Sequence, residues 1–114
     1  MRVTSELFVS ALLRRIQASG GFGAIVRRGN REAGAVFILE RARNGETALF
    51  GPAPQMVYSE AKPDERCFSR MMTTSDAGEI AQKLEKEARF DSDIWAVEVE
   101  PGSIPLSEMI TVSQ

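Results

Sequence analysis

The spacing of apolar residues predicts two amphipathic helices. The first lies near the start of the chain, where Thr4 or Ser5 can serve as N-cap and Gly20 ends the pattern. The second begins at Asp76, which with Glu79 three residues later forms a capping-box pattern. The expected buried faces are Phe8, Val9, Leu12, Leu13 and Ile16 in the first helix, and Ala77, Ile80, Ala81, Leu84 and Ala88 in the second.

Five other segments have the alternation or β-rich composition of strands. They cover residues 22–28, 35–41, 46–50, 66–72 and 94–100. The second is apolar on both faces, which predicts a central place in the sheet. Asn44-Gly45 predicts a type I′ hairpin turn after it. The segment from Gly29 to Gly34, rich in residues that tolerate positive φ, predicts a turn between the first two strands, and Gly51 to Pro54 is expected to stop regular structure.

The order of these elements predicts an α+β domain. We expect a mainly antiparallel sheet of about five strands with two helices packed on it, in a single domain that covers residues 1–114. The tail from Ser103 to Gln114 keeps several apolar residues. It should dock either as a short edge strand of its own domain or on a partner.

Composition excludes most familiar catalytic and metal sites. The chain has no histidine and one cysteine, Cys67, which rules out Ser-His-Asp and Cys-His systems, zinc fingers and iron-sulfur clusters. We expect no cofactor and no metal, and assign no catalytic residue. A non-enzymatic function is favoured, while an enzyme that uses carboxylates or arginine with a borrowed cofactor stays open. Cys67 is interpreted as a small buried hydrophobic residue.

The expected location is the cytoplasm. A single cysteine forms no intrachain disulfide, which favours a reducing compartment. The apolar run from Leu7 to Leu13 is too short to span a bilayer and runs into Arg14 and Arg15. We therefore expect no association with a membrane.

Charge is distributed unevenly along the chain. The net charge is only −2, but residues 1–43 hold eight arginines against three glutamates, and the remainder is strongly acidic. Such asymmetry arises either because a basic face binds a partner or because the two halves attract each other within one fold.

A group of arginines is the one constellation with a functional hypothesis. It comprises Arg27, Arg28, Arg31, Arg41 and Arg43. Planar guanidinium groups suit phosphate or carboxylate, and a hairpin would hold several of them together. Interleaved aromatic stacking partners are missing, because Phe22 and Phe37 are expected to point inward. Contact with phosphate or nucleic acid, ion pairing with the acidic half, and contact with a protein all stay open.

Six segments are distinctive in combination. They are Leu13-Arg14-Arg15, residues 22–29 (FGAIVRRG), residues 33–38 (AGAVFI), residues 49–55 (LFGPAPQ), Phe68-Ser69-Arg70, and residues 89–98 (RFDSDIWAVE). Together they resemble the bacterial domain of unknown function 1491, over about residues 5 to 100. The resemblance implies a small cytosolic bacterial protein without an established activity, cofactor or catalytic residue. No functional residue is carried over from it.

Two functions are weighed on these grounds. The first is an interaction or regulatory module that works through protein contacts, with a homodimer or another protein as partner. The alternative is a binder of a phosphorylated ligand or nucleic acid through the arginine hairpin. The candidate site residues are Arg27, Arg28, Arg31 and Arg41, with Gln55 of the proline-containing loop expected to converge on them.

Overall fold

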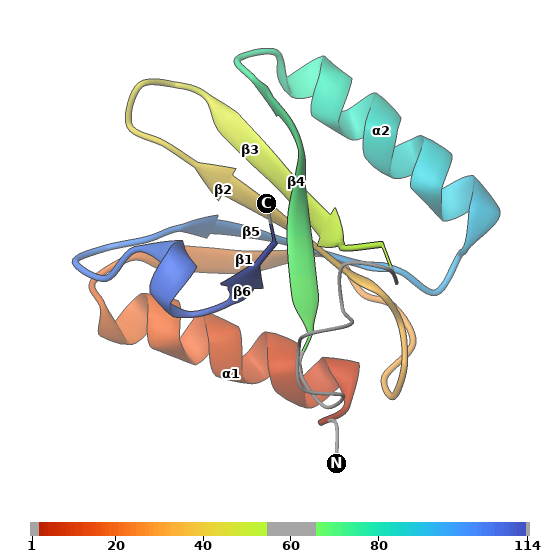
Figure 1. The fold of residues 1–114 in the computed structure, drawn as a ribbon, viewed down its shortest axis with the longest axis horizontal. Helices are drawn as coiled ribbons and strands as arrows, with labels where there is room; N and C mark the ends of the chain where they lie inside the picture. The colour runs from red at the N-terminus through yellow and green to blue at the C-terminus, as the bar shows by residue number, and fades with distance from the viewer. Residues whose placement is uncertain (1–2, 55–65, 114) are drawn as a thin grey trace.

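One sheet carries both helices of the computed structural model, which describes residues 3–54 and 66–113 (Figure 1). The elements in chain order are α1 (Ser5–Ala18), β1 (Phe22–Arg27), β2 (Val36–Arg41), β3 (Thr47–Pro52), β4 (Cys67–Thr74), α2 (Ala77–Phe90), β5 (Trp95–Glu100), the 3-10 helix η2 (Leu106–Glu108) and β6 (Thr111–Val112). The strands lie in the order β1-β5-β2-β3-β4-β6. The predicted α+β class is confirmed, with six strands instead of about five.

The last long strand separates the first two. β5 pairs antiparallel with β1 and parallel with β2, so β1 and β2 do not form the expected hairpin. The reason is burial: Trp95, Val97 and Val99 of β5 are fully buried, which a place between two other strands provides. The predicted central position of β2 is confirmed, since β5 and β3 flank it.

The hairpin between β2 and β3 is confirmed, but its turn type is not. The backbone N–H of Ala42 donates to Glu46 O (2.9 Å), and that of Gly45 donates to Ala42 O (3.2 Å). Gly45 has φ of +89°, whereas no other residue type in the described segments has positive φ. A type I′ turn needs positive φ at both central residues, so Asn44 does not form one. The connection is a type I turn followed by a left-handed glycine.

Both predicted helix starts are confirmed. Thr4 Oγ1 accepts from the N–H of Leu7 (3.2 Å), and the side chain of Asp76 accepts from the N–H of Gly78 (2.8 Å). The capping box of α2 is indirect. Thr74 Oγ1 accepts from the N–H of Asp76 and donates to the Glu79 carboxylate. In a direct capping box the Glu79 carboxylate would accept from the backbone N–H of Asp76. Here the Thr74 hydroxyl lies between the two groups and satisfies that N–H instead.

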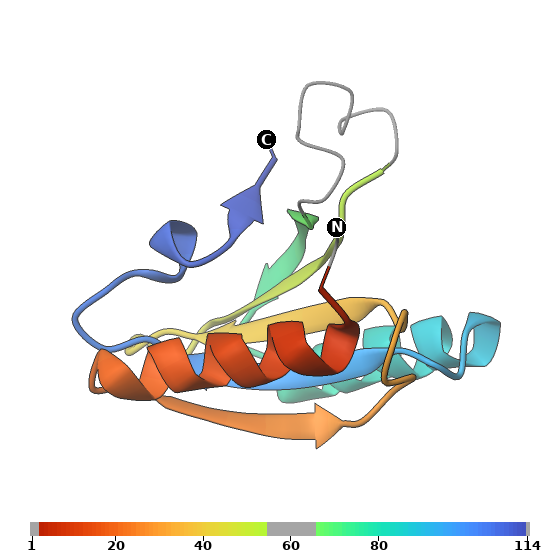
Figure 2. The same cartoon turned by 90° about the horizontal axis from the view of Figure 1, so that it is seen from below.

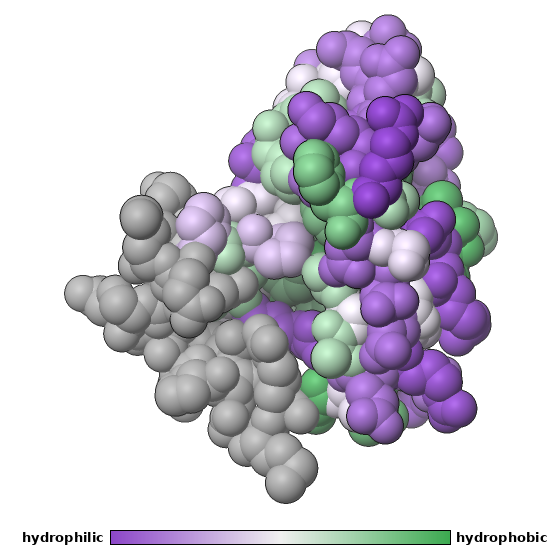
Figure 3. Space-filling model, turned by 90° about the vertical axis from the view of Figure 1, so that its right-hand side faces the viewer, coloured by the Kyte–Doolittle hydropathy of each residue, from purple (hydrophilic) through white to green (hydrophobic). Residues whose placement is uncertain are grey.

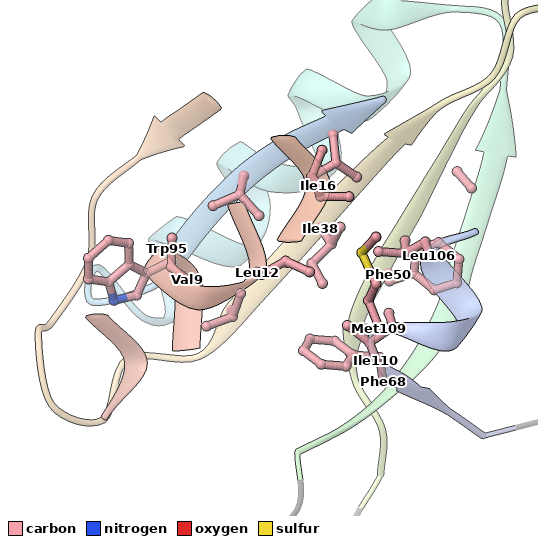
Figure 4. Packing of buried hydrophobic residues seen from close by; sticks show 14 residues of the cluster. Val9, Leu12, Ile16, Ile38, Phe50, Phe68, Trp95, Leu106, Met109 and Ile110 are labelled. Atoms are coloured by element: carbon pink, nitrogen blue, oxygen red, sulfur yellow. The ribbon is translucent and has the colours of Figure 1, made fainter. Parts of the chain in front are cut away.

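The helices cover opposite faces of the sheet (Figure 2). Successive residues of a strand point to opposite faces, so β2 sends Ile38 towards α1 and Phe37 towards α2. Figure 4 shows the larger cluster, in which α1 packs beside the sheet and the C-terminal tail covers the rest of the same face. Its labelled members are Val9, Leu12, Ile16, Ile38, Phe50, Phe68, Trp95, Leu106, Met109 and Ile110.

The apolar tail docks on its own chain. β6 pairs parallel with β4 at the edge of the sheet, and Leu106 of η2 is 2% exposed. The guanidinium of Arg15 donates to the backbone oxygens of Met109 and Glu108, both at 3.2 Å. This contact ties α1 to the tail. Of the two placements expected for the tail, the edge strand is the observed one.

The third strand continues past residue 50, where the sequence predicted that it would end. Pro52 still pairs with Phe68 of β4, and the N–H of Ala53 donates to Cys67 O (3.0 Å). The pairing of β3 with β2 ends at Phe50, so the proline lies where no donor is needed on that side. Cys67 is buried, as predicted.

Candidate functional site

Three of the predicted arginines lie at one end of β1 and make internal contacts. Arg27 donates through Nη2 to Ser92 O (2.9 Å). Arg28 lies over the ring of Trp95, 5.3 Å from its centre, and its Nη1 is 3.7 Å from a Glu6 carboxylate oxygen. Arg31 donates to Glu6 Oε1 from Nε and Nη2, at 3.2 and 3.1 Å. These ion pairs are exposed, so each contributes little to stability. They nevertheless hold the loop to α1.

The loop that carries Arg28 and Arg31 is a docked element rather than an open turn. Asn30 Oδ1 accepts from the backbone N–H groups of Glu32 and Ala33, both at 3.0 Å. Asn30 O accepts from Trp95 Nε1 (2.7 Å), and its N–H donates to Asp93 O (2.9 Å). Figure 3 faces the side of the molecule where this loop lies, and that surface is largely hydrophilic.

The glycines of this loop are required by space and not by φ. Neither Gly29 nor Gly34 has positive φ. A Cβ atom on Gly29 or Gly34 would lie 2.1 or 2.2 Å from Asp93 O, far inside van der Waals contact. The two glycines therefore allow the loop to close around the backbone that enters β5.

Arg41 lies at the other end of the sheet, away from these three arginines. β1 and β2 both pair with β5 but run in opposite directions, so the end of β2 lies beside the start of β1. Six residues of strand separate the two ends by about 20 Å. Arg41 Nη1 is 3.5 Å from Glu98 Oε1, an ion pair between the basic and acidic halves. The structure does not bring the predicted arginines together, and Gln55 lies outside the described residues.

The sequence predicted β1 as a strand but did not predict that its apolar side chains would be exposed. β1 is one of the two terminal strands of the sheet, and Figure 2 shows it at the outer border. Phe22 is 56% exposed, Val26 56% and Ile25 37%. Phe22 therefore does not point inward, because the edge position leaves its side of the strand uncovered. The alternation of Phe22 to Arg27 predicted a strand but carried no information on which strands would flank it.

A half-buried carboxylate lies on the face covered by the tail. Glu40 continues the row of Val36 and Ile38 on β2, and its carboxylate makes no hydrogen bond or ion pair with the described part of the chain. Burial raises the pKa of Glu40 above its ordinary value of 4.5, and the positive charge of Arg70 opposes that rise. A signal for it was present in the sequence, because every second residue of a strand shares a face.

Glu40→Gln is expected to stabilise the protein at neutral pH. A carboxyl whose folded-state pKa is raised favours the folded state when protonated and costs stability once ionised, so the wild type loses stability as pH rises through that pKa. Glutamine carries no charge at any of these pH values. Thermal melts should show a higher Tm for the variant at pH 7 and a difference that shrinks below pH 4.5. If the Tm of the variant minus that of wild type were lower at pH 7 than at pH 4, the effect of burial on Glu40 would be contradicted.

Two classes of site are not found in the described segments. Residues 3–54 and 66–113 contain no group of three or more His, Cys, Asp or Glu side chains placed to hold a metal ion. Asp91 and Asp93 form a local turn in which Asp91 Oδ1 accepts from the N–H of Asp93 (3.0 Å). Neither helix in those ranges has the length and apolar character needed to cross a membrane.

The fold and its surfaces define a small α+β protein with an open apolar edge strand and arginines tied to its own loop and sheet. A family model described as "Protein of unknown function (DUF1491)" matches residues 3–104. The chain belongs to this family, which confirms the resemblance seen in its motifs. A comparison with curated proteins found no match.

Solved structures of similar chains share the fold. The solution structure of protein Atu0922 from A. tumefaciens is 43% identical, with a TM-score of 0.83, and the alignment covers 100% of this chain and 97% of that one. The crystal structure of a DUF1491 family protein from Caulobacter crescentus is 28% identical, with a TM-score of 0.78 and complete coverage of both chains. An NMR structure of a DUF1491 family protein from the same organism gives 28% identity, a TM-score of 0.77, and coverage of 100% and 99%.

Proposed function

We propose that the protein is an interaction module that works through protein contacts, and that its partner is a second copy joined through the edge of β1. The observation that carries this proposal is the exposure of Phe22, Ile25 and Val26 on the terminal strand. Edge strands usually carry lysine, proline or inward-pointing charge to prevent pairing with another chain. The six residues of β1 include neither lysine nor proline, and the strand's one charge, Arg27, and its one register shift, between Ile25 and Arg27, both lie at its C-terminal end.

The sequence of β1 is suited to pairing with itself. Closed dimers use the same surface twice, so two β1 strands would pair antiparallel about a two-fold axis. With the axis at Ala24, Gly23 of each copy would lie opposite Ile25 of the other, and Phe22 would lie near Val26, which falls in the register shift between Ile25 and Arg27. An aromatic ring opposite a β-branched side chain contributes roughly 0.2–1 kcal/mol per pair. The two-fold axis makes each of these pairs occur twice.

Charge supports the same register. Arg27 ends β1, while at the start of the strand Phe22 pairs with Glu100 of β5, which is exposed. Antiparallel pairing therefore brings the arginine of one copy towards the glutamate of the other, at both ends of the contact. Such complementarity favours one register and orientation over others.

The alternative function, binding of a phosphorylated ligand or nucleic acid, stays a prediction with weaker support. Arg27, Arg28 and Arg31 contact oxygens of Ser92 and Glu6, and Arg41 contacts Glu98. A phosphate would have to displace these partners. The arginines also lie at two opposite ends of the sheet, where one ligand would not reach both.

Phe22→Lys is expected to abolish the dimer. Light scattering after size exclusion should give about twice the 12.5 kDa monomer mass for wild type. The variant should be monomeric, because each dimer loses two apolar contacts and gains two charges within the paired strands, a loss of more than about tenfold in affinity. Val26→Lys should act in the same way.

Phe90→Lys is the matched control. Phe90 ends α2 and is 81% exposed, so the same change alters hydrophobicity and charge away from β1. It should leave the dimer intact. A wild type that remains monomeric at all concentrations, or a dimer that survives Phe22→Lys, would refute the proposal.

A further inference from the structure

A hollow of about 440 Å³ opens between the sheet and the C-terminal tail. Its walls are Glu40 of β2, Phe50 of β3, Arg70 of β4, Val112 of β6, and Pro105, Leu106 and Ser107 in and beside η2. This volume falls within the usual range for small-ligand sites, and the mixture of apolar walls with a few charged groups is also typical of them. None of the contacts described for β1 involves this hollow.

Two opposite charges face the hollow from strands that are not neighbours. Glu40 lies opposite Ala48 of β3, and Arg70 lies opposite Phe50 of the same strand, on the same face. With one strand between them, their backbones are separated by about 10 Å across the sheet. No ion pair joins them within the described residues. Both charged side chains therefore line the same hollow without forming an ion pair with each other.

The guanidinium of Arg70 is held in place by other contacts. Its central carbon lies 5.3 Å from the centre of the Phe50 ring, and Nη1 donates weakly to Thr73 Oγ1 at 3.4 Å. These contacts use the face of the group and one of its donors. The remaining N–H groups can donate to a carboxylate, which arginine binds in a planar, bidentate geometry.

The apolar part of the site comes from the tail. Leu106 is anchored in the core cluster, while Pro105 and Val112 flank it along the hollow. Because Arg15 ties the backbone beside Leu106 to α1, this wall is fixed with respect to the sheet. A ligand with an aliphatic body would contact the wall while its polar groups face the sheet.

We propose that the hollow binds a zwitterionic amino acid with an aliphatic side chain. Its ammonium group would pair with the Glu40 carboxylate, its carboxylate with Arg70, and its side chain would lie against Pro105 and Val112. The Glu40 carboxylate has no hydrogen bond or ion pair in the described chain, so a cation there would compensate the cost of its burial. A molecule that carries only one of the two charges would leave the other protein group unmatched.

L-leucine is the probe. Titration into ¹⁵N-labelled protein should shift the backbone amide signals of Glu40, Arg70 and Ser107 in a saturable way. Leucinamide lacks the carboxylate and N-acetyl-L-leucine lacks the ammonium group, and each should bind at least about tenfold more weakly, since one charged hydrogen-bonded contact is lost. The absence of any saturable shift with L-leucine, or equal binding of all three compounds, would overturn the proposal.

Two variants assign the charges. Glu40→Gln should weaken the binding of L-leucine without weakening that of N-acetyl-L-leucine, which lacks the ammonium group. Arg70→Gln should weaken the binding of L-leucine without weakening that of leucinamide, which lacks the carboxylate. Glu46→Gln and Arg43→Gln, at the exposed turn between β2 and β3, are the matched controls and should leave binding unchanged. Thermal melts of each variant report on folding. Folded Glu40→Gln and Arg70→Gln proteins that bind L-leucine as tightly as wild type would place the ligand elsewhere and refute the site.

Discussion

Gly34→Ala is expected to lower the free energy of unfolding by about 3 kcal/mol, at the upper end of the cost of overpacking. The added methyl carbon would lie 2.2 Å from Asp93 O and 2.9 Å from the backbone nitrogen of Asn30. Both neighbours are backbone atoms that already hydrogen-bond to each other at 2.9 Å, so neither can move without breaking that bond. Gly34 O also accepts from the hydroxyl of buried Ser5, and displacement of the loop would disturb the start of α1.

Thermal unfolding measures the effect. A loss of that size should lower Tm by at least about 10 °C in a domain of this length. Gly45→Ala is the control, because nothing lies within 4 Å of its added carbon and only the strain of φ at +89° remains. That strain costs about 1–2 kcal/mol. If Gly34→Ala destabilised less than Gly45→Ala, the close approach to Asp93 would be refuted.

Local elements were predictable because their signals are local. Thr4 caps α1 through a hydrogen bond three residues away, and the apolar spacing of that helix places Val9, Leu12 and Ile16 in the core. In the same way Asp76 marks the start of α2. These features depend on residues within one or two helical turns of each other, so they can be predicted from the sequence.

Strand order was not predictable in the same way. Insertion of β5 between β1 and β2 joins it to segments about 70 and about 60 residues earlier in the chain, and nothing in the alternation of these strands specifies their neighbours. The separation of the arginines does not depend on this insertion. Arg27 ends β1 and Arg41 ends β2, and the two strands run in opposite directions, so these residues lie at opposite ends of the sheet whether or not the strands pair. What the insertion changes is their partners, Ser92 and Glu98, which come from the segment that intervenes.

The candidate sites show the same division. The composition of β1 was visible, but exposure of Phe22 depends on the strand being terminal. Glu40 differs, because its position two residues after Ile38 already placed a carboxylate on a face that is otherwise apolar. Its proximity to Arg70 required the pairing of three strands. Residue types and faces can be taken from sequence, whereas the meeting of two charges requires the register.

Trp95→Ala is expected to destabilise the protein by about 4 kcal/mol, within the range for removal of a buried aromatic side chain. Trp95 is fully buried, and it joins elements that the sequence separates widely. Its Nε1 donates to Asn30 O, its backbone N–H donates to Ala35 O at 2.7 Å, and Arg28 lies over the ring. Loss of the ring leaves a cavity beneath the loop and removes the surface on which Arg28 rests.

Trp95→Phe separates packing from hydrogen bonding. Phenylalanine keeps most of the apolar contact but no donor, so the cost should fall to about 1–2 kcal/mol, the loss of one buried hydrogen bond plus a small void. Denaturant unfolding followed by circular dichroism measures both variants, since the chain has a single tryptophan and the substitutions remove its fluorescence. Phe90→Ala, at an exposed site, should change stability by less than about 0.5 kcal/mol. Equal stability of Trp95→Ala and Phe90→Ala would show that the loop does not depend on the ring beneath it.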